Sequence, residues 1–290
     1  MVGIGSKSQW ISKPPLGVGV NWSHPLASGL SRAFLFNDKG KQTFRDACVG
    51  DSASYSRSAS DTKWGADHFV AGAEGGSPTF ETAKANGFGA TSITVAARWA
   101  AFGSNPHLES APFGGAPTNH AYNSRYNNGS DIGFGLGITS STAAVYVNSD
   151  GLGLGASGSF TATSGVPFTV VGTYKRDTGV ATYGGTWSVY GNGRLLGSNN
   201  LHVGGSFAGT FSSVKAYMFK GSGANMSDKL LYWLYVWVGR ALSAGDVAEL
   251  QANPYAFMQP VRRRSFAFLD AGGGGATAFP HHYYAQMRAA

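Results

Sequence analysis

The chain is poor in charge and nearly free of cysteine. Only 13% of its 290 residues are Asp, Glu, Lys or Arg, about half the share of an average globular protein. Aromatic residues make up another 13%, and a chain with low charge and many aromatics packs a core rather than staying disordered. The one cysteine, Cys48, can form no disulfide within the chain, which fits folding in a reducing cytoplasm.

Long apolar segments and targeting segments are also missing from the sequence. The apolar run at residues 230–238 has about half of the roughly 18 residues that a membrane-spanning helix needs. The first ten residues, MVGIGSKSQW, have no apolar core like that of a signal peptide. We therefore expect synthesis in the cytoplasm, no membrane partner, and exit only by a route such as virion release.

Motifs of hydrolytic enzymes are missing as well. A retaining glycosidase needs two carboxylates about 5–5.5 Å apart, which alternate positions of one strand could supply. The chain has four glutamates, none with a second acid two residues away: Glu74, Glu81, Glu109 and Glu249. Neither Gly-x-Ser-x-Gly nor His-Glu-x-x-His occurs. We therefore expect no catalytic residues and no enzymatic activity, although acids far apart in the sequence could still meet in space.

One glycine motif invites a nucleotide-binding interpretation. Residues 153–158 match Gly-x-Gly-x-x-Gly, but a dinucleotide site needs a helix directly afterwards. Residues 159–167 are instead β-like and end in a proline. We interpret the motif as a glycine-rich β loop.

Glycine and alternating apolar residues dominate the rest of the chain. The 43 glycines, about twice the usual share, indicate many turns. Alternation in the run 230–238 places Leu231, Trp233, Tyr235 and Trp237 on one face of a strand and the remaining residues on the other. Because both faces are apolar, we expect this strand to be covered on both sides, with Trp233 and Trp237 buried.

Other β-like segments precede this run. We expect strands at residues 31–36, 52–55, 68–70, 92–99, 132–138, 143–147, 168–174, 187–190 and 214–219. Asn192-Gly193 predicts a two-residue hairpin turn.

A short helix should follow the apolar run. Ser243 is a favourable N-cap, and Asp246 three residues later completes a capping-box pattern. Asn253-Pro254 should end the helix.

Two segments at the ends of this β pattern resemble a known family. Residues 240–244, Arg-Ala-Leu-Ser-Ala, followed by a short helix and Asn253-Pro254-Tyr255, are similar to the closing segment of LamG-like domains. Those domains are concanavalin A-like jelly rolls that occur in structural proteins of tailed phages. Residues 21–26, Asn-Trp-Ser-His-Pro-Leu, are similar to the element before the first strand in the phage versions. The match departs at Gly239, where the family usually has Asn.

This resemblance implies an all-β fold, an antiparallel β-sandwich of the concanavalin A-like jelly-roll type with one short C-terminal helix. We expect an extended N-terminal arm at residues 1–29, the LamG-like domain at 30–268, and a glycine-rich, then aromatic and basic tail at 269–290. The implied function is structural: a capsid decoration or cement protein located in a phage virion. The alternative is a carbohydrate-binding adhesin or tail-fibre component that recognises host-surface glycans.

The densest positive charge of the chain, whose net charge is +7, lies at residues 262–264, just before the tail. These arginines can pair with carboxylates, and glycines at residues 272–275 let the tail leave the domain freely. The residues expected to dock it onto a partner are Arg262, Arg263, Arg264, Phe279, Tyr283 and Tyr284. The expected partners are the major capsid protein, another virion protein, or further copies in a dimer or trimer. One basic run does not make a nucleic-acid footprint, so we expect no nucleic-acid partner.

A long segment at residues 103–130, rich in glycine, proline and asparagine, is typical of a functional or docked loop. Its aromatic residues could contact a glycan or pack the loop onto its surroundings: Phe113, Tyr122 and Tyr126. Many LamG-like domains hold calcium through such oxygens as those of Asn127, Asn128, Asp131 and Asp150. The same four could be turn residues that bond their own backbone. The sequence therefore requires no cofactor and leaves calcium open.

Overall fold

The computed structural model describes fourteen stretches of the chain. They are residues 13–14, 17–37, 43–48, 52–54, 63–64, 69–71, 79–81, 92–101, 133–139, 142–149, 152–177, 183–203, 215–217 and 229–260. All belong to a unit that spans Met1–Pro260, and Val261–Ala290 form a second unit outside the described residues. None of the helices in these stretches is long and apolar enough to cross a membrane.

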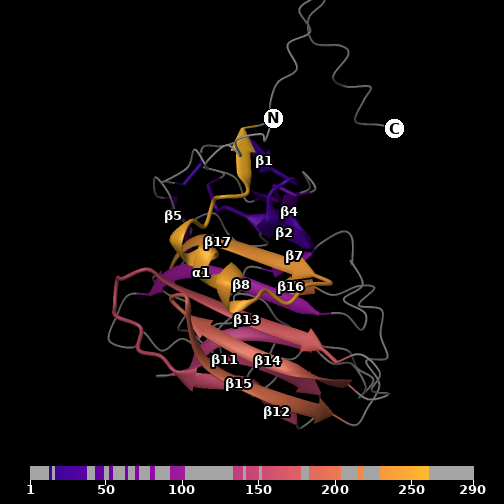
Figure 1. The fold of residues 1–290 in the computed structure, drawn as a ribbon. Helices are drawn as coiled ribbons and strands as arrows, with labels where there is room; N and C mark the ends of the chain where they lie inside the picture. The colour runs from indigo at the N-terminus through magenta and orange to yellow at the C-terminus, as the bar shows by residue number, and fades with distance from the viewer. Residues whose placement is uncertain are drawn as a thin grey trace, which may run out of the picture. The chain divides into compact units, whose positions relative to one another are not determined.

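Strands dominate these stretches, and the pairings between them are antiparallel. The strands are β1 (Val18–Val20), β2 (Leu30–Phe34), β3 (Thr43–Arg45), β4 (Ser52–Ser54), β5 (Lys63–Trp64), β6 (Phe69–Ala71), β7 (Thr79–Glu81), β8 (Ile93–Ala101), β10 (Gly133–Thr139), β11 (Thr142–Ser149), β12 (Leu152–Ser159), β13 (Phe168–Arg176), β14 (Tyr183–Gly191), β15 (Arg194–Val203), β16 (Lys215–Tyr217), β17 (Lys229–Val238) and β18 (Met258–Pro260). The described stretches also hold one α-helix, α1 (Ala244–Ala252), and a 3₁₀ turn, η1 (Pro25–Ala27). The predicted all-β antiparallel sandwich with one short C-terminal helix is confirmed (Figure 1).

Eight strands form the large sheet. Seven follow the order β15-β14-β13-β8-β17-β6-β5, and β2 also pairs with β17. A second sheet has the order β10-β11-β12. Three strand pairs lie apart from both sheets: β1-β18, β16-β7 and β3-β4.

One face of the large sheet packs against the three-stranded sheet. Buried residues of both sheets form a single apolar cluster: Val95, Trp99, Val170, Trp187, Leu136, Ala143 and Ala156 are among its members. Trp99 and Phe168 contact edge to face, with ring centroids 4.6 Å apart. This cluster is the core of the sandwich, since apolar burial is the main favourable term in folding.

The opposite face of the large sheet is covered by α1, by residues 17–30 and by β18 (Figure 1). Trp233, Tyr235 and Trp237 of β17 are fully buried in this second layer. Val247 and Leu250 of α1 pack with them. Strand β17 is therefore covered on both sides, and the predicted burial of Trp233 and Trp237 is confirmed.

Leu231 does not share a face with Trp233, contrary to the sequence prediction. It packs in the sandwich core with Leu234 and Val236, whereas Trp233 lies in the second layer. The pairing of β17 with β8 shifts register between Leu231 and Trp233. Such a bulge adds one residue to a strand and breaks its alternation, which a reading of apolar spacing cannot detect.

The glycine motif at residues 153–158 belongs to a strand and not to a loop, because Leu152–Ser159 pair with β11. A Cβ atom at Gly158 would overlap the backbone of Leu196, and one at Gly197 would overlap the carbonyl oxygen of Ser157. The missing side chains let β12 and β15, one from each sheet, approach closely at this edge. The motif therefore serves packing.

Two turns have the backbone conformation that their residues favour. Asn192-Gly193 joins β14 to β15 with φ of 47° and 82°, as a two-residue hairpin turn requires. Gly239, which follows β17, has φ of 80°. Glycine and asparagine tolerate this left-handed region best, so glycine suits this position.

Ten observed strands match predicted ones within a few residues: β2, β4, β6, β8, β10, β11, β13, β14, β16 and β17. Short strands and those rich in glycine or polar residues were missed: β1, β3, β5, β7, β12, β15 and β18. Residues 17–29, part of the predicted arm, contain β1 and η1 and pack in the second layer. The domain boundaries at residues 29 and 268 stay predictions.

Candidate functional site

The residues singled out in the sequence for binding lie outside the described part of the chain. They are Arg262, Arg263 and Arg264 before the tail, Phe279, Tyr283 and Tyr284 of the tail, Phe113, Tyr122 and Tyr126 of the long loop, and the calcium candidates Asn127, Asn128, Asp131 and Asp150. Within the described stretches, no group of three or more His, Cys, Asp or Glu is placed to hold a metal ion. These roles stay predictions, and the structure brings together a different set of residues.

Residues 21–24 form a tight turn next to β18. The amide of Asn21 donates to the carbonyl of Phe257 (2.7 Å), and the amide of His24 donates to the carbonyl of Asn21 (3.0 Å). The side chain of Asn21 accepts from the amide of Ser23 (3.2 Å). These bonds fix the backbone on both sides of Trp22.

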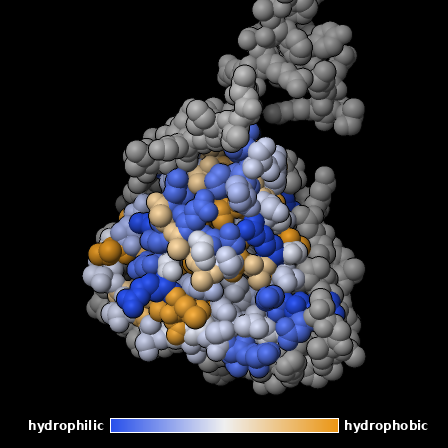
Figure 2. Space-filling view, viewed as in Figure 1, coloured by the Kyte–Doolittle hydropathy of each residue, from blue (hydrophilic) through white to orange (hydrophobic). Residues whose placement is uncertain are grey.

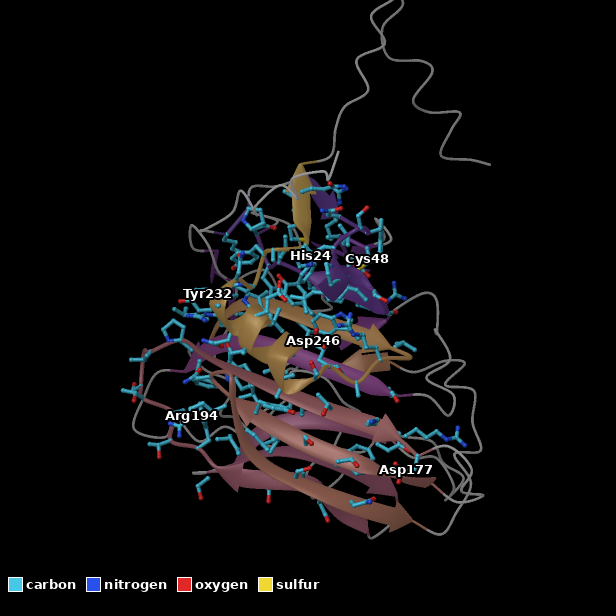
Figure 3. The ribbon with its side chains drawn as sticks, viewed as in Figure 1. His24, Cys48, Asp177, Arg194, Tyr232 and Asp246 are labelled. Carbon is cyan, nitrogen blue, oxygen red and sulfur yellow. The ribbon has the colours of Figure 1, made fainter. Side chains whose placement is uncertain are left out.

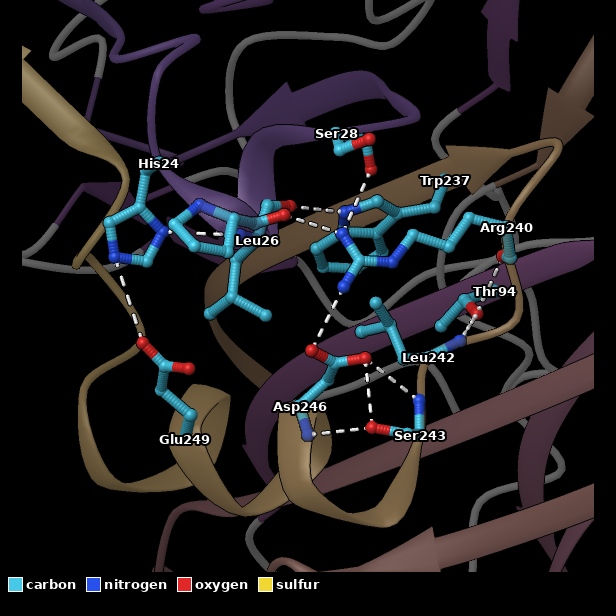
Figure 4. Close-up of polar contacts among 11 residues, drawn as sticks. His24, Leu26, Ser28, Thr94, Trp237, Arg240, Leu242, Ser243, Asp246 and Glu249 are labelled. Carbon is cyan, nitrogen blue, oxygen red and sulfur yellow. Dashed lines mark hydrogen bonds and ion pairs between the residues drawn. The ribbon is translucent and has the colours of Figure 1, made fainter.

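His24 connects this turn to helix α1. Its Nδ1 accepts from the amide of Leu26 (3.2 Å) and caps η1. Its Nε2 lies 3.6 Å from Oε1 of Glu249 (Figure 4). Because Nδ1 accepts a hydrogen bond, a neutral His24 carries its proton on Nε2, toward the carboxylate.

Arg240, just after β17, binds the N-terminal segment and α1 at once. Its Nη1 donates to the carbonyls of Pro25 and Ser28, and its Nη2 donates to Oδ1 of Asp246 at 2.9 Å (Figure 4). The rigid fork of a guanidinium suits such simultaneous contacts. Arg240 is thus engaged by three acceptors within the domain.

Side chains of β8 and β17 also hydrogen-bond the segments that Arg240 connects. The hydroxyl of Thr94 donates to the carbonyl of Arg240 (3.0 Å) and accepts from the amide of Leu242 (2.9 Å). Nε1 of Trp237 donates to the carbonyl of Leu26 (2.7 Å). Each of these buried polar groups has a partner, which avoids the cost of an unpaired one.

The predicted capping box of α1 is confirmed. Oγ of Ser243 accepts from the amide of Asp246 (3.2 Å), and Oδ2 of Asp246 accepts from the amide and the hydroxyl of Ser243 (2.9 and 3.0 Å). Partial burial alone would raise the pKa of Asp246, but hydrogen bonds from Ser243 and Arg240 outweigh burial and hold this pKa below its ordinary value. Since Ser243 pairs with Asp246 while His24 faces Glu249, these residues do not form a nucleophile–base pair.

Trp22 is the large side chain that this fixed turn leaves in solvent. It is 58% exposed, whereas the other described tryptophans for which burial is given are buried. Glu249, the partner of His24, keeps 49% of its side chain exposed. The sequence points to Trp22 only through the family resemblance, because tryptophan in an apolar pattern usually predicts core.

A second polar surface lies on the outer face of β13–β15, beside α1. The hydroxyls of Ser188 and Ser198 lie 3.0 Å apart, and Ser198 also donates to the carbonyl of Trp187. Leu195 is 56% exposed at the start of β15. Figure 2 shows mostly hydrophilic and neutral surface over these strands, with a hydrophobic patch. The serine hydroxyls bond one another, so this face offers less to a ligand than the Trp22 turn.

Cys48 is not a reactive thiol. Burial, with the nearby carboxylate of Asp46, strongly raises its pKa, and a thiol is nucleophilic only as thiolate. Asp46 accepts from the amides of Ala33 and Cys48 and pairs with Arg32 at 3.1 Å. This buried cluster therefore ties β2 to residues 46–48. Figure 3 shows Cys48 inside the same part of the domain as His24, far from Asp177 and Arg194.

Comparison with known proteins places the fold. No protein-family model and no curated protein matches the chain. Among solved structures it is similar to the sialidase of Trypanosoma rangeli in complex with sialic acid, at 16% identity and a TM-score of 0.52, over 78% of this chain and 33% of the sialidase. It is also similar to the receptor binding domain of botulinum neurotoxin D, at 12% identity and a TM-score of 0.52, over 79% of this chain and 54% of that chain.

These neighbours correct the expectation that the chain is not an enzyme. A sialidase has a similar fold, and so does a mutant of it displaying trans-sialidase activity. The absence of paired glutamates on one strand therefore does not exclude catalysis. The chain spans about a third of the sialidase and about half of the neurotoxin chain, and at these identities the likeness concerns architecture alone. The chain is therefore an all-β sandwich, with an architecture similar to parts of a sialidase and of a receptor binding domain.

Proposed function

We propose that the chain is a recognition domain that binds host-surface glycans through the turn of residues 21–24, and that it is carried on a phage virion. The observation that supports this most is the exposure of Trp22 on a turn whose backbone is fixed by hydrogen bonds on both sides. Tryptophan is among the residues most enriched at the energetic centres of binding surfaces.

The chemistry of the turn suits a sugar. A tryptophan ring offers a flat apolar face on which a pyranose ring can stack, and it loses little side-chain entropy on binding. The polar side chains of the turn, Asn21 and Ser23, and that of Glu249 beside His24 can exchange hydrogen bonds with hydroxyl groups. A few placed polar groups beside an apolar surface are the usual composition of a small-ligand site.

The fold is compatible with this proposal without deciding it. One solved neighbour is a receptor binding domain, and another holds sialic acid. Placement on a virion rests on the LamG-like resemblance of residues 21–26 and 240–255, two segments that contact each other through Arg240 and His24. Under this proposal the tail and the preceding Arg262, Arg263 and Arg264 dock onto the major capsid protein, another virion protein or a neighbouring copy.

Glycan binding is tested with the purified full chain on an array of neutral and acidic glycans, followed by calorimetry on the best hits. Trp22→Ala should weaken binding by about 2 kcal/mol or more, as loss of an aromatic anchor does. Leu195→Ala is the matched control, since Leu195 is equally exposed but lies on the β14–β15 hairpin. Equal affinities of the two variants, or no glycan bound by the wild-type chain, would overturn the proposal.

Virion location has its own test. Purified phage particles that encode this chain should contain it in stoichiometric amounts by quantitative mass spectrometry. Its absence from intact particles would refute the location while leaving glycan binding to the test above.

A further inference from the structure

We infer that the Trp22 turn selects neutral glycans over sialylated ones. This inference rests on the proposed function and names the class of sugar that the same turn would take. The net charge of +7 of the whole chain and the sialic acid held by one of the solved neighbours would suggest the opposite preference. The inference is based instead on the local charges around the turn.

Glu249 sets the charge next to the turn. Its Oε1 lies 3.6 Å from Nε2 of His24, and half of its side chain is exposed. The carboxylate therefore remains in contact with solvent on the side where the turn meets α1 (Figure 4). Its other oxygen has no recorded partner among the described residues and can accept hydrogen bonds from a ligand.

Arg240 does not offset this charge. It is held by Asp246, Pro25 and Ser28, so its guanidinium is paired with a carboxylate and three of its N–H donors are used inside the junction. His24 is oriented with Nδ1 accepting from Leu26 and Nε2 at 3.6 Å from Oε1 of Glu249. Its Nε2 thus already faces a carboxylate of the protein.

A carboxylate and a neutral sugar are complementary in hydrogen bonding. An ionised carboxylate only accepts, and neighbouring hydroxyls of a hexose can donate to it. A sialic acid bound at this turn adds a second negative charge to the surface that carries Glu249, and repulsion in a solvent-exposed site disfavours binding about three- to ten-fold. The turn thus discriminates by charge between two sugars that could stack equally well on Trp22.

The test compares lactose with 3′-sialyllactose on the full chain by calorimetry or ligand-observed NMR. The wild-type chain should bind lactose about three- to ten-fold more tightly. Glu249→Gln removes the charge and keeps an acceptor, so it should abolish this preference by raising affinity for 3′-sialyllactose. Asp177→Asn is the control of equal charge, because Asp177 lies at the far end of β13 from the turn (Figure 3).

The outcomes separate the two proposals. Tighter binding of 3′-sialyllactose that still depends on Trp22 overturns the charge selection and leaves glycan binding in place. An equal response of Glu249→Gln and Asp177→Asn shows a long-range charge effect and also overturns it. Binding of neither sugar overturns the inference and leaves the proposed function to the glycan array. Binding that ignores Trp22→Ala defeats the proposed function and the inference with it.

Discussion

Trp237 in β17 and Leu26 in η1 join two segments that are distant in the sequence. Nε1 of Trp237 donates to the carbonyl of Leu26 at 2.7 Å, across 211 positions of sequence. The indole is fully buried between the large sheet and the segments that cover it. One side chain thus fills the second core layer and fixes the N-terminal segment on it.

Replacement of Trp237 should separate these two roles. Trp237→Ala should lower the free energy of unfolding by about 3–5 kcal/mol, because it leaves a large cavity. Trp237→Phe keeps most of the ring but leaves the Leu26 carbonyl unpaired, and should cost about 1–3 kcal/mol. Urea denaturation measures both values, and an Ala variant as stable as wild type would contradict the assigned core position.

Gly197 should tolerate no side chain. A Cβ atom there would overlap the carbonyl oxygen of Ser157 in the other sheet, so Gly197→Ala should force β12 and β15 apart and destabilise the domain by about 1–3 kcal/mol. Gly245→Ala in α1 is the control, since its nearest neighbour, Oγ of Ser243, would lie 3.8 Å away. That change should raise stability by about 0.5–1 kcal/mol. Thermal melts showing the same shift for both would refute the close approach of the sheets.

Tyr235→Phe should leave stability unchanged or raise it. The hydroxyl of Tyr235 is buried and has no hydrogen-bond partner among the described residues, so its removal relieves a desolvation cost. Tyr235→Leu should destabilise, because the ring stacks on Trp233 with centroids 4.6 Å apart. A Phe variant that loses about 1 kcal/mol or more would mean that the hydroxyl has a bonded partner.

The capping box should make stability depend on pH at the acid end. The pKa of Asp246 is lower in the folded chain than its ordinary value, so the charged carboxylate contributes stability above the unfolded pKa of about 3.9. This contribution is lost as pH falls through the folded pKa. Wild type should therefore exceed Asp246→Asn by about 1 kcal/mol near pH 7, and the difference should vanish toward pH 2–3. A constant difference from pH 7 to pH 2 in melts would contradict this linkage.

Removal of the tail should spare the fold. A chain truncated after Asp270 keeps every described strand and helix, since β18 ends at Pro260. We expect an unchanged melting temperature and loss of the chain from assembled particles, because the tail carries the aromatic residues expected to dock. Unchanged occupancy on particles would show that Phe279, Tyr283 and Tyr284 are not the anchor.

Local signals in the sequence predicted much of this fold. Ser243 and Asp246 cap α1 because both partners lie within one helical turn, and Asn192-Gly193 adopts the backbone that its hairpin needs. Leu231 was assigned to the wrong face because a bulge arises from pairing with β8, which the sequence of β17 alone does not encode. The β-strand at residues 152–159 was missed because its glycines are needed for close contact with β15, which is distant in the sequence.

The candidate site was less predictable than the fold. His24 and Glu249 are far apart in the chain, and only the packing of α1 on residues 17–30 brings them within 3.6 Å. The exposure of Trp22 depends on the path of the turn, not on its apolar character. Spacing rules describe neighbours along one element. They cannot predict a surface that forms from two segments distant in the sequence.

The pairing of β1 with β18 has a consequence for biosynthesis. Gln259 and Val20, which contact each other there, are 239 positions apart. A ribosome adds about 5–20 residues per second, so the first strand waits roughly 12–48 seconds for its partner. During that interval the outer face of the large sheet lacks α1, and exposed apolar surface of this kind promotes aggregation. We expect productive folding to occur only after residue 260 leaves the ribosome, and to depend on chaperones in the producing cell.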